Sequence, residues 1–152
     1  MTDDQVVTDG KALKSWYKGV LDGVVRDMLQ AGAVVGTAIE ASPVWTVPNE
    51  ILIARVWATG QQNSFIWTIA GERMITDHIA GSVAATPRDV ARHFSLKWQV
   101  DAERLFQIAR RKDVPASAGK AIETYAGRII QCAERLYDLA SREDIWQHQL
   151  TD

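Results

Sequence analysis

The sequence has little of what secreted and membrane proteins require. Only one cysteine, Cys132, occurs among the 152 residues, so a disulfide within the chain is excluded and a reducing compartment is indicated. No hydrophobic run approaches the roughly 20 residues that cross a bilayer. The first residues are acidic, where a signal peptide is basic. We therefore expect a cytoplasmic protein with no membrane partner.

Excess positive charge is also lacking. Lys and Arg number 17 against 19 Asp and Glu, a formal net charge of −2. Nucleic-acid-binding domains are normally basic on one face, so the composition argues against such a partner. The one basic run, residues 110–112, follows a predicted helix, where cations complement the helix dipole. Together with Arg104 it supports only a third-ranked hypothesis of nucleic-acid binding.

Motifs for cofactors and metals are absent as well. The chain has no glycine-rich phosphate loop, no G-x-S-x-G and no pair of histidines at H-x-x-x-H spacing. A metal site would have to bring Asp77, His78 and His93 together with His148 or Glu72. We expect no cofactor and no metal.

What the chain does have is ordinary globular composition, with 47% hydrophobic and 24% charged residues. Its length fits one domain with a sizeable core. Residues 1–9 are polar and lack periodicity, which predicts a disordered tail. Residues 10–152 are predicted to form a single α+β domain.

Hydrophobic periodicity predicts the elements of this domain. Helical spacing of apolar residues covers 11–31, 86–111 and about 115–141, and period-two alternation covers 50–58 and 64–70. The interrupted stretch 33–49 contains Pro43 and Pro48 and predicts an edge strand with a loop. The last helix has the clearest apolar stripe, which comprises Ile122, Tyr125, Ala126, Ile129, Ala133, Leu136, Tyr137 and Ala140. The predicted fold is a small antiparallel sheet, two central strands plus the edge strand, packed against three amphipathic helices in the order α-β-β-β-α-α.

Asp77 and His78 are the candidate catalytic residues. They follow the strand at 64–70, and a carboxylate beside an imidazole can orient it for proton transfer. The structural alternative is that Asp77 accepts backbone hydrogen bonds in a turn while His78 lies at the surface. Both readings remain open.

Arg88, Arg92 and His93 are the candidate ligand-binding residues at the start of the helix at 86–111. Arg88 and Arg92 share a helix face and could hold a carboxylate or phosphate. Alternatively, Arg92 pairs with Asp89 and Arg88 reaches Asp77, which would make a structural network.

Trp45, between the two prolines, is the candidate interface residue. An aromatic on an interrupted edge strand could be presented to a second copy. The other five tryptophans are predicted to lie mostly in the core.

Four segments resemble a known family: residues 67–71 (Trp-Thr-Ile-Ala-Gly), 76–79 (Thr-Asp-His-Ile), 92–99 (Arg-His-Phe-Ser-Leu-Lys-Trp-Gln) and 133–139 with Trp146. They look like an uncharacterised family of small bacterial proteins, a domain of unknown function. The resemblance implies a bacterial single-domain α+β protein and brings no activity, cofactor or catalytic residue. The chain departs from the family pattern at Glu72, at the absence of a proline before Thr76 and by one extra residue.

Two functions follow as hypotheses. The first is a small non-enzymatic interaction module that self-associates as a homo-oligomer, because apolar surface is plentiful and catalytic motifs are lacking. The alternative is an enzyme or small-molecule-binding protein, with Asp77 or His78 as acid/base and Arg88 or Arg92 as an anion clamp.

Overall fold

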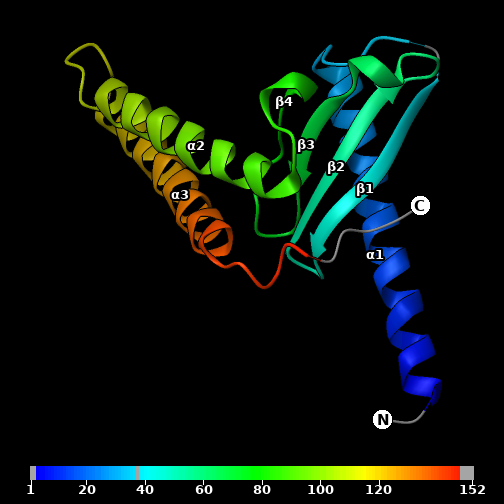
Figure 1. Ribbon diagram of the computed structural model, residues 1–152. Helices are drawn as coiled ribbons and strands as arrows, with labels where there is room; N and C mark the ends of the chain where they lie inside the picture. The colour runs from blue at the N-terminus through cyan, green and yellow to red at the C-terminus, as the bar shows by residue number, and fades with distance from the viewer. Residues whose placement is uncertain (1–2, 37, 148–152) are drawn as a thin grey trace. The chain divides into compact units, whose positions relative to one another are not determined.

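The computed structural model describes residues 3–36 and 38–147, and the chain divides into two compact units. The first unit takes the chain up to Pro87 and holds helix α1 and the β-sheet, and the second is Arg88–Gln147. The elements follow the order α-β-β-β-β-α-α (Figure 1). The predicted α+β class is confirmed.

Helix α1 spans Asp3–Gln30 and packs one apolar stripe against the sheet. Val24 and Met28, one turn apart, are buried at the centre of this stripe. Burying side chains of this size stabilises a fold by about 1.5–3 kcal/mol each. The buried cluster beneath the helix comprises Val24, Met28, Val34, Val56, Ala58 and Ala70. The helix ends just before Gly32, whose φ of 69° suits a residue that terminates a helix.

The backbone of α1 is helical from Asp3, and the predicted disordered tail over residues 1–9 stays a prediction. The helix begins at Asp3, ahead of the first apolar repeat. Extending a helix that already exists gains one backbone hydrogen bond per residue, so a polar segment can continue it without an apolar stripe. Periodicity therefore marks the buried part of this helix and not its full length.

The sheet has four antiparallel strands in the order β1-β2-β3-β4. Their bounds are Ile39–Val47, Ile51–Ala58, Ile66–Ala70 and Asp77–Ala80. Strands β2 and β3 are central, as predicted, and residues 51–54 are buried on both faces. Strand β1 lies at the predicted edge, and its register shifts between Pro43 and Trp45, where the proline cannot donate to the ladder.

Strand β4 corrects the prediction of three strands. Asp77 and His78 were expected on a loop, but the segment pairs with β3, with His78 opposite Thr68 and Ile79 opposite Trp67. Its four residues are too few and too polar to show alternation. The strand forms because pairing with β3 satisfies its backbone groups.

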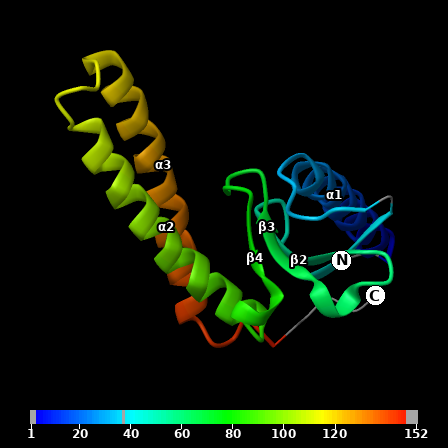
Figure 2. The same cartoon turned by 90° about the horizontal axis from the view of Figure 1, so that it is seen from above.

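The second unit is a helical hairpin. Helix α2 spans Pro87–Ala109 and α3 spans Ala116–Ser141, close to the predicted bounds. The helices run antiparallel and side by side (Figures 1 and 2). A Cβ at Gly119 would lie 2.8 Å from the Ala109 carbonyl oxygen, so only glycine permits this close approach where the hairpin turns.

The apolar stripe predicted for α3 is only partly buried. Ala126, Ala133 and Leu136 are in the core, whereas Tyr125 and Tyr137 are 52% and 60% exposed. These two tyrosines therefore belong to the apolar stripe of the sequence without being buried in the core. Both lie at the margin of the stripe, where a phenol can keep its hydroxyl in water.

Candidate functional site

The predicted site residues fall into two groups that belong to different units. Asp77 and His78 lie on β4 in the first unit, and Arg88, Arg92 and His93 lie in the first two turns of α2 in the second. Each group is built by contacts within its own unit.

On β4, the Asp77 carboxylate binds backbone. Its Oδ1 accepts a hydrogen bond of 2.7 Å from the backbone N–H of His78, and both residues are partly buried. This contact matches the structural reading, in which a short acidic side chain satisfies a nearby backbone donor. Proton transfer by Asp77 and His78 stays a prediction.

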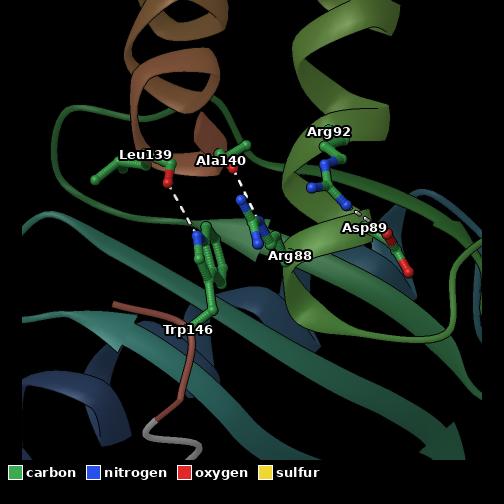
Figure 3. A network of polar contacts seen from close by, with 6 residues as sticks. All are labelled: Arg88, Asp89, Arg92, Leu139, Ala140 and Trp146. Carbon is green, nitrogen blue, oxygen red and sulfur yellow. Dashed lines mark hydrogen bonds and ion pairs between the residues drawn. The ribbon is translucent and has the colours of Figure 1, made fainter. Parts of the chain in front are cut away.

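Arg88 and Trp146 cap the C-terminal end of α3. Arg88 Nε donates to the Ala140 carbonyl oxygen and Trp146 Nε1 donates to that of Leu139, each at 2.9 Å (Figure 3). The last carbonyls of a helix have no partner within the helix, and a cation there complements the dipole. The structural role predicted for Arg88 is therefore supported, with Ala140 as a partner in place of the expected Asp77.

Arg92 forms the pair expected from its spacing. Its Nη1 lies 3.1 Å from Asp89 Oδ1, one turn earlier in α2 (Figure 3). The Arg92 side chain is 53% exposed, and exposed pairs of this kind contribute only about 0.2–1 kcal/mol. His93 packs its ring edge-to-face against Phe94, with 6.1 Å between ring centres. The imidazole behaves as a boundary residue.

The two arginines share one hollow of about 340 Å³ between α2 and α3, which we call the arginine hollow. Its lining residues are Arg88, Arg92, Ser95, Leu96, Tyr137, Ala140 and Ser141. Ser95 is 1% exposed, and its hydroxyl has no hydrogen-bond partner within the described part of the chain. Buried hydroxyls are nearly always paired, so this one is an unused polar group beside the hollow. His93 does not line the hollow.

The arginine hollow continues along the same face of the hairpin. A second hollow of about 670 Å³ shares Tyr137 with it, and a third of about 360 Å³ shares Gln99 with the second. Together the three form what we call the hairpin groove. The second is lined by Gln99, Ile130, Glu134, Tyr137 and Asp138, and the third by Gln99, Val100, Glu103, Arg104 and Gln107.

Apolar side chains are exposed along this groove. Leu96 is 63% exposed and Val100 57%, in addition to Tyr137. Isolated exposed apolar residues are ordinary, whereas large contiguous apolar patches are typical of interaction surfaces. The groove therefore combines exposed apolar side chains with Arg88 and Arg92 at one end and Glu103 and Arg104 at the other.

Beyond α3, the carboxyl group of Asp144 has a lowered pKa. Arg142 Nη2 donates to Asp144 Oδ2 at 3.1 Å, and this hydrogen bond is the main reason that the pKa of Asp144 lies below its ordinary value. The Asp144 side chain is 72% exposed, so water weakens the interaction.

Other predicted features resolve more simply. Trp45 is 2% exposed, so its indole is buried, and its role as an interface residue stays a prediction. Cys132 is buried. Within residues 3–36 and 38–147, no cluster of acidic, histidine or cysteine side chains could hold a metal. Across the same residues, no helix has the length and hydropathy to cross a membrane. His148 lies outside the described residues.

The groove residues were missed by reasoning from the sequence. Ser95, Leu96 and Val100 were not singled out, because the buried stripe of α2 was followed through Phe94 and Trp98. A signal was available, since Leu96 and Val100 stand one turn apart off that stripe.

Comparison with known proteins assigns no activity to this fold. No curated protein and no solved structure matches the chain. A family model described as Domain of unknown function (DUF4826) matches residues 11–146 and so includes nearly all of both units. The chain belongs to this family of uncharacterised domains.

Proposed function

We propose that the protein is a small interaction module that forms a homodimer through the hairpin groove. The observation that carries this proposal is the line of exposed apolar residues, Leu96, Val100 and Tyr137, along one continuous hollowed face. Such a face loses unfavourable contact with water when a matching surface covers it.

The spacing along α2 suits packing against another helix. Arg92, Leu96, Gln99 and Glu103 follow one another at intervals of four, three and four residues, the repeat that keeps one stripe of a helix facing its partner. Helix α2 has 23 residues, which gives a length of about 35 Å. Two hairpins joined along this face would form a four-helix bundle.

Charge complementarity supports a second copy as the occupant of the groove. Arg92 and Glu103 lie on opposite sides of the point midway between Lys97 and Trp98, at equal distances from it along the sequence. If two α2 helices cross antiparallel about a two-fold axis at this midpoint, Arg92 of each copy faces Glu103 of the other. Leu96 then lies against Gln99 of the second copy, and every contact occurs twice.

A charge exchange tests this pairing. In a dimer of either Arg92→Glu or Glu103→Arg, position 92 of each copy faces a like charge at position 103 of the other. Each variant alone should therefore dimerise about tenfold more weakly or worse. An equimolar mixture should recover dimer, because in the heterodimer both positions carry opposite charges. Sedimentation velocity of each variant and of the mixture measures the result.

Val100→Glu should also give a monomer, because it replaces one of the exposed apolar side chains of the proposed interface with a charge. The matched control is Tyr125→Glu, which changes an exposed aromatic of the same hairpin outside the three hollows. A wild-type protein that stays monomeric across a wide concentration range, or a mixture that dimerises no better than its components, would overturn the proposal.

The cytoplasm is part of this proposal, supported by the single buried cysteine, which suits a reducing compartment. The enzymatic alternative has less support, because the Asp77 carboxylate already accepts a bond from neighbouring backbone. The arginines support a ligand-binding role that a single chain can perform.

A further inference from the structure

We infer that the arginine hollow binds a small monocarboxylic acid with an apolar tail. The inference does not depend on the proposed dimer, because every lining residue of the hollow belongs to one chain. Its volume of about 340 Å³ lies near the lower end of the range typical of small-molecule sites.

Two guanidinium groups supply the positive charge. Arg88 uses its Nε to cap α3 at Ala140, and its two Nη groups have no hydrogen-bond or ion-pair partner among the described residues. Arg92 contacts Asp89 through Nη1 in an exposed pair that is easily rearranged. The planar fork of a guanidinium matches a carboxylate and can hold both of its oxygens.

Ser95 is the second, independent indication of a ligand. Its side chain belongs to the hollow's wall, and its buried hydroxyl has no partner among the described residues. A buried hydroxyl is destabilising unless it donates a hydrogen bond to an acceptor oxygen or accepts one from a donor.

The other residues that line the arginine hollow determine which kind of tail the ligand has. Leu96, Tyr137 and Ala140 are largely apolar, and Tyr137 leads on into the second hollow of the groove, where an apolar chain can extend beside Ile130. The carbonyl end of α3 also lies at this hollow, and the negative end of its dipole opposes added negative charge. A monoanion therefore fits better than a doubly charged phosphate.

Octanoate is the probe, and octanamide, which has the same shape without the charge, is its matched control. Both are titrated into the Val100→Glu variant, whose substitution lies outside the arginine hollow, so that binding is measured even if the dimer covers the groove. Isothermal calorimetry gives the affinity, and the NMR signals of the arginine Nε–H groups report the place of binding. We expect octanoate to bind at least tenfold more tightly than octanamide and to shift the Arg88 and Arg92 signals.

Three variants complete the test. Arg92→Gln should weaken octanoate binding at least tenfold and Ser95→Ala severalfold, while Arg110→Gln, which removes an exposed arginine outside the hollow, should leave the affinity unchanged. Circular dichroism checks that each variant is folded. Equal affinity for octanoate and octanamide, no binding at millimolar concentration, or full affinity in Arg92→Gln would overturn the inference. None of these results bears on whether the wild-type protein dimerises.

Discussion

At the scale of single residues, Gly71 shows how one position can decide whether the sheet forms. It ends β3 with a φ of 156°, and a Cβ there would lie 1.8 Å from the Glu50 carbonyl oxygen. No side-chain rotation relieves a contact between a Cβ and backbone. The sequence predicts only that a strand ends near residue 71. It does not show the need for glycine, because Glu50, whose carbonyl oxygen excludes a side chain there, lies 21 positions earlier in the chain.

Gly71→Ala should lower the free energy of unfolding by more than about 3 kcal/mol, since it combines a backbone clash with an unfavourable φ. Gly60→Ala is the matched control, because Gly60 also has a positive φ but has open space where its Cβ would lie. That variant should cost about 1 kcal/mol. Urea unfolding of the two proteins measures the difference, and equal costs would show that the clash with Glu50 is relieved by movement of the backbone.

At the scale of elements, the C-terminal end of α3 depends on side chains from outside the helix. The Ala140 carbonyl accepts from Arg88, which is 52 residues earlier, and the Leu139 carbonyl accepts from Trp146 (Figure 3). The sequence correctly predicted that Arg88 and Arg92 share a helix face and that Arg92 pairs with Asp89, because both follow from the helical repeat. It could not predict that Ala140 is a partner of Arg88, since that contact needs the hairpin to close.

Trp146→Phe keeps the aromatic ring and deletes the N–H that caps Leu139, so it should destabilise the last turn of α3 by about 1 kcal/mol. Arg88→Met should cost about 1–2 kcal/mol, because a hydrogen bond and a favourable dipole interaction are lost together. Hydrogen exchange of the amides in this turn measures both effects. Arg128→Met, an exposed arginine further back in α3, is the control, and exchange rates that match the control in both variants would contradict the capping role.

At the scale of the whole molecule, the proposed dimer and the proposed ligand share Arg92. The dimer uses this guanidinium to face Glu103 of the second copy, and the ligand uses it to hold a carboxylate. Because the second copy and the acid compete for this guanidinium, each weakens the binding of the other by the same factor. Binding of the acid should therefore favour the monomer.

Saturating octanoate should weaken the wild-type dimer by roughly twofold to thirtyfold, because two exposed ion pairs are lost from each dimer. Sedimentation velocity at fixed protein concentration, with octanamide as the control, measures the shift. A dimer that is unaffected while octanoate is bound would show that Arg92 does not contribute to both contacts.

The sequence by itself determined the three helices, the two central strands and the edge strand with its prolines. Hydrophobic periodicity and the backbone limits of proline and glycine act between residues close in the chain, so they can be read without a structure. Only the tertiary structure decided that residues 77–80 form a strand, that Tyr137 and Leu96 are exposed, and that Arg88 caps α3 beside a hollow. These features depend on which distant segments meet, because burial and hydrogen bonding at each position are set by neighbours in space.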